Sequence, residues 1–176
     1  MTAPICPTCA TAAVLTTGAA VYPNRPDLAA KPIWRCEGCG AYVACHPDTT
    51  VPLGTPADAA TRAARMNLHQ KRLDPLWKEA WREPAYAKNG CGPKTRRSIQ
   101  KAARERVYAY LAGRMRLTPA ECHTGLFTRE QCRVAWGVLS ATSYAEIRTW
   151  ARALNPKPRR ERKAPSPSSD IQRIAR

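Results

Sequence analysis

Apolar residues in the N-terminal third of the chain occur in short runs that are broken by turn residues. The runs at 13–16, 33–35 and 41–44 are too short for helices and are typical of strands. The segment at 22–27 contains two prolines and an asparagine, which favour turns, so it predicts an irregular insertion between the first two strands. The pattern therefore predicts a small three-stranded unit.

Beyond residue 55 the apolar residues recur with helical spacing, and helix start signals recur with them. Thr55-Pro56 and Asp74-Pro75 each place a capping side chain before a proline at the first helical position. Capping-box patterns start at Thr118, Thr128 and Ser143. These signals predict helices over 56–72, 75–83, 95–115, 119–122 (a single turn), 128–139 and 143–153.

The helix predicted over 95–115 has an apolar face and a basic face. At about 100° per residue, the face predicted to pack inward carries Ile99, Ala103, Val107 and Tyr110. The opposite face is a basic stripe with an aromatic ring at its end, which suits phosphates and a stacked base. A solvated helix face is the alternative, although such a face ordinarily mixes charge signs. The candidate nucleic-acid contacts here are Lys94, Arg96, Arg97, Lys101, Arg104 and Tyr108.

Basic residues are concentrated in two parts of the chain. The net charge of +16 favours a polyanionic partner, most often nucleic acid. Residues 1–56 are neutral, with three basic and three acidic side chains, whereas 91–116 carry eight basic side chains and one acid, Glu105. Residues 155–176 are rich in proline and serine and predict a disordered basic tail. Its candidate phosphate contacts are Arg159, Arg160, Arg162 and Lys163.

Four cysteines form two Cys-x-x-Cys pairs within the strand unit. Cys6 and Cys9 precede the first predicted strand, and Cys36 and Cys39 lie between the second and third. Two such pairs can complete the tetrahedral thiolate shell that zinc prefers at structural sites. The arrangement predicts a zinc ribbon with one structural Zn²⁺, and Gly38 and Gly40 suit the positive-φ positions of its turns.

The remaining cysteines and histidines offer weaker alternatives. Cys45-His46 could exchange with one ligand of the ribbon, but packing of the cysteine under the ribbon is the simpler interpretation. A second metal set would combine residues of irregular spacing, and Cys132 falls on the apolar face of its helix. Its members would be Cys91, Cys122, His123 and Cys132.

Acidic residues give no recognisable catalytic set. His69 with Asp58 and Asp74 could suggest a metal-dependent nuclease, but both acids have simpler roles at helix N-termini. Cys122 and His123 are adjacent, a spacing that rarely gives nucleophile–base geometry, and no third orienting group is evident. We therefore expect a protein that is not an enzyme and has no small-molecule substrate.

Several separated blocks resemble one family of proteins. Residues 34–46 read WRCEGCGAYVACH, 52–58 read PLGTPAD and 74–77 read DPLW, and further blocks lie at 22–28, 122–127 and 131–132. In these blocks the chain resembles a family of phage and prophage proteins known only as zinc-finger-containing. The resemblance implies a zinc site and a phage origin but no reaction. Ala10 departs from it, because a glycine usually follows the first cysteine pair.

The expected fold class is α+β, with a zinc ribbon, a mostly helical body and a basic tail. The predicted units are a ribbon at 1–54, a helical extension at 55–87 packed on the ribbon, a basic helical domain at 94–154 and the tail at 155–176. Trp77 and Trp81 are predicted to form the seam against the ribbon.

The leading functional prediction is a phage-encoded zinc-ribbon protein that binds nucleic acid without catalysis, DNA in preference to RNA. The alternative is a host-takeover or counter-defence protein that docks on a host protein complex. No basic and apolar leader begins the chain, and no run approaches the roughly eighteen apolar residues of a membrane span. We therefore expect a cytoplasmic protein, with thiols that are metal ligands or buried rather than disulfides.

Overall fold

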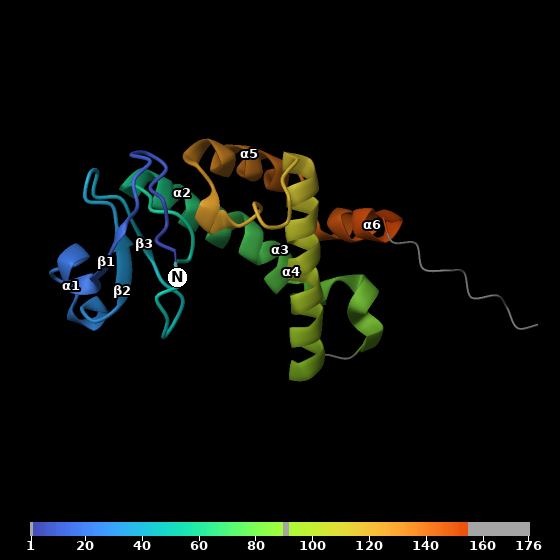
Figure 1. Ribbon diagram of the computed structural model, residues 1–176. Helices are drawn as coiled ribbons and strands as arrows, with labels where there is room; N and C mark the ends of the chain where they lie inside the picture. Colours follow the sequence, from blue (N-terminus) through green and yellow to red (C-terminus); the bar gives the residue numbers. More distant parts are fainter. Residues whose placement is uncertain (1, 90–91, 155–176) are drawn as a thin grey trace, which may run out of the picture.

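A small antiparallel sheet and a larger helical body make up the protein (Figure 1). The computed structural model describes residues 2–89 and 92–154. The fold is α+β, as the sequence predicts, with the strand unit at the N-terminus. The predicted ligand Cys91 and the tail contacts at 155–176 lie outside the described residues.

Three strands form the N-terminal sheet in the order β1-β2-β3. They are β1 (Val14–Thr17), β2 (Pro32–Arg35) and β3 (Tyr42–Ala44), and both pairings are antiparallel. Trp34 lies at the centre, opposite Leu15 on one side and Val43 on the other. The insertion between β1 and β2 contains two short helices, α1 (Gly18–Val21) and η1 (Pro26–Leu28). The three predicted strands are therefore confirmed to within a residue or two at their ends.

The first long helix, α2 (Ala59–Leu68), begins later than the Thr55-Pro56 signal predicts. Residues before it stay extended, because Ala57 pairs with Tyr42 through two backbone hydrogen bonds of 3.1 and 3.2 Å. The helix is instead capped by Asp58, whose carboxylate accepts a hydrogen bond of 2.7 Å from the backbone N–H of Thr61. Strand pairing thus overrides the proline signal and moves the helix start to residue 59.

An α-helix begins at Asp74-Pro75, as the sequence predicts, but no break separates it from α2 and the Asp74 side chain does not cap it. A π-helical turn, η2 (His69–Leu73), links α2 directly to α3 (Asp74–Lys78). The backbone N–H of Asp74 bonds to the carbonyl of His69, five residues back. The wider turn accommodates Pro75, which has no N–H and would clash in an ordinary α-helical turn. Two 3₁₀ segments, η3 (Ala80–Arg82) and η4 (Pro84–Asn89), follow.

The helical body is built around α4 (Pro93–Met115), which packs against α3, α5 (Arg129–Ser140) and α6 (Tyr144–Leu154). The residues predicted to face inward on α4, namely Ile99, Ala103, Val107 and Tyr110, are all buried. The largest fully buried side chains around them are Leu68, Leu73, Leu111, Phe127 and Ile147. The two-faced pattern of the sequence therefore reports the orientation of α4 correctly.

Trp77 and Trp81 pack against this helical core and not against the ribbon. The expected extension at 55–87 accordingly contributes Leu68, Leu73 and Ala80 to the same core as α4, α5 and α6. The physical reason is the amount of apolar surface available. The ribbon has a separate small core of Cys6, Cys36 and Ala41, whereas the long helices offer a much larger apolar face.

The capping patterns near the C-terminal end have different outcomes. Thr128 and Gln131 form a full capping box at the start of α5, and Ser143 and Glu146 exchange hydrogen bonds at the start of α6. Thr118 and Glu121 make the same exchange, but the chain forms only a turn at 119–121 and no helix. At His123 the backbone is already extended (φ −122°, ψ 121°), and a short 3₁₀ segment, η5 (Thr124–Leu126), follows. The single turn predicted at 119–122 is therefore confirmed, since the N–H of Cys122 bonds to the carbonyl of Thr118 at 3.0 Å, but it does not extend into a regular helix.

Candidate metal centre and basic surface

Two similar turns bring the four predicted zinc ligands together. In each turn a backbone N–H bonds to the carbonyl of the first cysteine, from Ala10 to Cys6 at 2.8 Å and from Gly40 to Cys36 at 2.9 Å. The chain then enters a left-handed conformation, with φ of 54° at Ala10 and 72° at Gly40. The four Sγ atoms, of Cys6, Cys9, Cys36 and Cys39, all lie within 4.8 Å of one another.

The chemistry of this cluster fits a zinc ion. None of the four cysteines is in a disulfide. The hydroxyl of Thr11 lies 3.6 Å from Cys36 Sγ and, with backbone hydrogen bonding, lowers the pKa of that thiol to about 6. A hydrogen bond with Cys39, together with burial, raises the pKa of Cys9 to about 12. A divalent cation would displace the remaining protons, and four thiolates then complete a tetrahedral shell.

The other described cysteines lie apart from this cluster. Cys132 is buried on the inner face of α5, as the sequence predicts. Cys122 is also buried, its thiol donates to the carbonyl of Tyr108 at 3.6 Å, and burial raises its pKa to about 11. Cys45 is half-buried beside β3, in a backbone bridge to Pro52. Among residues 2–89 and 92–154, only the group of four has three or more cysteine, histidine or acidic ligand atoms gathered closely enough for a metal.

The basic face of α4 is exposed along its N-terminal half. Lys94, Arg96, Arg97, Lys101 and Arg104 all point away from the core. Arg96 lies over the ring of Trp81, 4.6 Å from its centroid, and Arg104 lies 5.8 Å from the centroid of Trp77. Within the described residues none of these five cations takes part in an ion pair. The helix therefore presents uncompensated positive charge.

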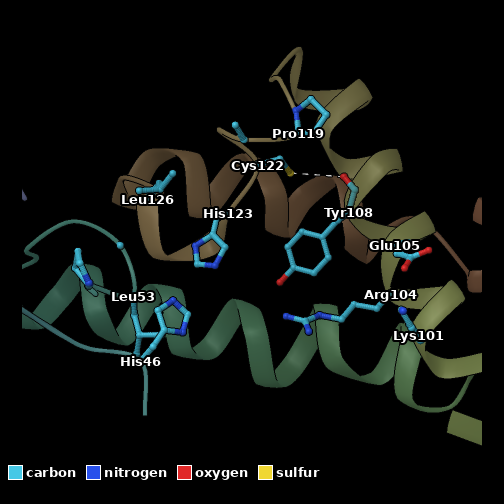
Figure 2. A pocket seen from close by; sticks show the side chains of 13 residues that line it. His46, Leu53, Lys101, Arg104, Glu105, Tyr108, Pro119, Cys122, His123 and Leu126 are labelled. Carbon is cyan, nitrogen blue, oxygen red and sulfur yellow. Dashed lines mark hydrogen bonds between the residues drawn. The ribbon is translucent and has the colours of Figure 1, made fainter. Parts of the chain in front are cut away.

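Tyr108 is more enclosed than the sequence predicts, since it does not lie on the open surface at the end of the basic face. It packs partly against the helical core, and burial raises the pKa of its hydroxyl. That hydroxyl lies 3.4 Å from His69 Nε2. Together with Lys101 and Arg104, Tyr108 lines a cavity of about 670 Å³ (Figure 2). The basic stripe thus leads into a concave site.

All three histidines of the chain contribute to this concave region, a convergence that the sequence does not predict. His46 follows β3, His69 lies in the π-turn and His123 lies between α4 and α5. His46 and His123 line the cavity beside α4, and all three line an adjoining hollow of about 540 Å³. In the sequence, His46 and His123 share only one feature, which is that each follows a cysteine in a predicted loop. That feature does not show that the two side chains lie close together.

Comparison with known proteins identifies the family to which the first half of the chain is similar. Residues 2–89, which are 88 of the 176 residues, match a family described as a zinc-finger-containing domain. The chain belongs to this family. The zinc-finger-containing domain includes all four clustered cysteines, so the match and the thiol geometry agree on a zinc-binding protein. No curated protein and no solved structure matches the chain.

Residues 59–89 of the zinc-finger-containing domain pack together with helices that follow it in the sequence. Arg65 of α2 shows how the two parts meet. Its guanidinium donates to the carbonyls of Phe127 and Thr55 at 2.8 and 2.9 Å. None of the helices in the described part of the chain combines the length and apolar character that crossing a membrane requires.

Proposed function

We propose that the chain is a nucleic-acid-binding protein that is not an enzyme, in which the zinc finger is structural and α4 contacts phosphates. DNA is the preferred partner, in the cytoplasm. A phage or prophage origin is part of the proposal and is supported by the resemblance of the separated sequence blocks.

The observation that carries the proposal is the uncompensated charge of α4. Lys94, Arg97 and Lys101 are exposed, and no described acid pairs with them. The one acidic residue of α4 is Glu105. An ordinary solvated helix carries both signs and gains from ion pairs three or four residues apart. On α4 only Lys101 and Glu105 have that spacing among the described residues of this face, and they form no ion pair within 4.0 Å. Phosphates along a nucleic-acid backbone would supply the missing counter-charge.

The neighbouring aromatic rings support the same proposal. Arg96 and Arg104 lie over the rings of Trp81 and Trp77. A guanidinium held against a ring keeps its N–H donors in a fixed plane, and planar donors match the oxygens of a phosphate. These contacts would reduce the conformational entropy that two long side chains lose on binding.

A structural role for zinc follows from its ligands. Four thiolates leave no coordination position for water or substrate, which a catalytic zinc requires. We propose one ion per chain at the four-cysteine cluster, which replaces the hydrophobic core that the ribbon is too small to build. The ion would fix β1, β2 and β3, and through Ala57 the start of α2.

Binding of the full chain to duplex DNA, single-stranded DNA and RNA at increasing salt tests the proposal. We expect log K to fall linearly with log salt, with a slope of about −0.9 per phosphate neutralised on duplex DNA. Affinity that stays undetectable for all three at low salt would overturn it. Purification of the tagged chain from cells, with and without nuclease, distinguishes the alternative, since a host protein retained after nuclease treatment would favour docking on a protein complex.

A further inference from the structure

The three histidines share a concave surface with the end of the α4 basic face. The cavity beside α4 is lined by His46, His123, Lys101, Arg104 and Tyr108, and the adjoining hollow adds His69. Figure 2 shows the imidazoles of His46 and His123 next to each other, with Tyr108 and Arg104 on the side of α4. Three histidines from separate segments of the chain thus lie next to Lys101 and Arg104, the last two cations of the basic face of α4.

Hydrogen bonds assign different roles to the three imidazoles. His69 Nδ1 lies 2.9 Å from an Asp74 carboxylate oxygen, and its Nε2 lies 3.4 Å from the Tyr108 hydroxyl. Both nitrogens of His69 are therefore engaged, and it positions Tyr108. His123 Nδ1 accepts from the backbone N–H of Gly125 at 3.2 Å, which leaves its Nε2 as the donor. His46 is exposed, and within the described residues its ring makes no hydrogen bond or ion pair.

The charge around His123 is mostly positive. Partial burial lowers the pKa of His123, and His46, Arg104, His69 and Arg65 lower it further. The facing acids are Asp74, which bonds to His69 and Lys78, and Glu105 at the rim. Cationic groups that repel one another across a concave surface are the arrangement that a bound anion stabilises.

The walls of the cavity are held together by a close backbone contact. The N–H of Thr55 donates to the carbonyl of Gly125 at 3.0 Å, and a Cβ added at Gly54 would lie 2.0 Å from that carbonyl oxygen. Arg65 joins the same two segments through its bonds to Thr55 and Phe127. The loops that carry His46 and His123 are therefore fixed relative to each other, and the donors are preorganised.

We propose that this three-histidine cavity binds a phosphate group, with His46, His123 and Arg104 as donors and Lys101 at its entrance. Its volume of about 670 Å³ is large enough for a nucleotide as well as for the phosphate itself. Because Lys101 and Arg104 belong to both surfaces, one source of the phosphate is the nucleic acid proposed above, and only that source rests on the proposed function. A small phosphorylated molecule is the other source.

A metal ion is a poorer occupant than an anion. The ligand atoms of the three histidines do not gather closely enough within the described structure to hold one ion. Arg104 and Lys101 would also repel a cation at this place. The same two residues attract a phosphate, and Arg104 offers the planar donors that suit its oxygens.

The test is NMR of the imidazole resonances of the full, zinc-loaded chain during titration with inorganic phosphate. Potassium chloride at matched ionic strength is the control titration. We expect saturable shifts of His46 and His123 with phosphate and not with chloride. In His46→Ala and Arg104→Ala, each of which removes the proposed donor, affinity should fall about tenfold, the size of one charge-assisted hydrogen bond. In Arg152→Gln, an exposed change on α6 outside the cavity, affinity should not change.

His123→Asn provides a second variant that keeps the fold. An asparagine oxygen can accept the Gly125 N–H as His123 Nδ1 does, but the shorter side chain has no donor at the position of Nε2. Loss of phosphate binding in this variant would therefore report the loss of the Nε2 donor. Equal shifts with chloride, or unchanged affinity in all three cavity variants, would overturn the proposal.

Short oligonucleotides with and without a 5′-phosphate distinguish the two sources. Cavity-dependent binding that is stronger with the terminal phosphate supports a nucleic-acid end. Phosphate binding in a chain that binds no oligonucleotide supports a small phosphorylated molecule and defeats the proposed function alone. Conversely, DNA binding that is unaffected by every cavity variant, without phosphate shifts, defeats the cavity proposal alone.

Discussion

Ala10 and Gly40 occupy equivalent positions, each immediately after the second cysteine of a Cys-x-x-Cys turn, and both have left-handed backbones. The φ angles are 54° and 72°, and in both turns the N–H bonds to the carbonyl of the first cysteine. A glycine adopts this conformation without strain, whereas an alanine places its Cβ too close to the backbone. One of two otherwise matched turns is therefore strained.

Ala10→Gly should stabilise the zinc-loaded protein. Relief of the left-handed strain favours the folded state by about 1 kcal/mol, partly offset by the greater freedom of glycine in the unfolded chain. Reversible denaturation in excess zinc measures the change. Gly40→Ala is the matched control and should destabilise the protein, so equal stability of all three forms would contradict the strain at residue 10.

Cys36→Ser should abolish stoichiometric zinc binding and unfold the ribbon. The ribbon core consists of Cys6, Cys36 and Ala41, so the bound ion supplies much of its folding free energy. Metal analysis should give one zinc per wild-type chain and none that is stable to dialysis in the variant. Cys45→Ser, a half-buried change outside the cluster, should keep its zinc. Two ions per wild-type chain would contradict the single site.

Gly125→Ala should destabilise the protein by a few kcal/mol, because the added Cβ would lie 2.1 Å from the carbonyl oxygen of Leu53. The loop that carries His123 would separate from the segment before α2. Gly137→Ala is the matched control, since a Cβ there meets no atom within 4 Å and alanine is the better helix former. Thermal denaturation should therefore show opposite signs for the two changes.

The lowered pKa of His123 predicts how stability depends on pH. Its folded pKa lies below the ordinary 6.5, so between the two values the unfolded chain binds more protons. This contribution to stability is full above about pH 6.5 and is lost as the pH falls through the folded pKa. The titratable and charged groups that face His123 are His46, His69, Arg65, Lys101, Arg104, Tyr108, Cys122 and the two acids Asp74 and Glu105.

NMR titration of the three imidazoles checks this expectation. His123 should have a pKa below that of a histidine in a model peptide, and inorganic phosphate should raise it, because a bound anion favours the protonated ring. A His123 pKa at or above the model value would contradict the cationic surroundings described here.

Local patterns predicted much of the fold, because they depend on neighbours in the sequence. The Cys-x-x-Cys pairs marked the ribbon, and helical spacing identified the buried face of α4. Pattern reasoning was wrong where tertiary contacts override a local signal. Strand pairing of Ala57 with Tyr42 delays α2, and the π-turn carries the helix through Pro75.

The cavity could not be predicted, because its residues are brought together by the packing of distant segments. His46 and His123 meet only because the segment before α2 crosses the loop before α5 at Gly54 and Gly125. No spacing in the sequence records that crossing. Trp77 and Trp81 illustrate the same point. Their spacing of four residues on one helix face predicts that they pack against another element, but it does not show whether that element is the ribbon or the helical core.

The salt dependence of DNA binding by α4 variants tests the central claim most directly. Arg97→Ala/Lys101→Ala removes two exposed cations from α4, and Arg129→Ala/Arg152→Ala removes two exposed cations from α5 and α6 as a charge-matched control. If α4 neutralises phosphates, the α4 double variant should lower the magnitude of the log–log slope on duplex DNA by about two, and the control should leave it near the wild-type value. Equal slopes for the two double variants would contradict a nucleic-acid interface on α4.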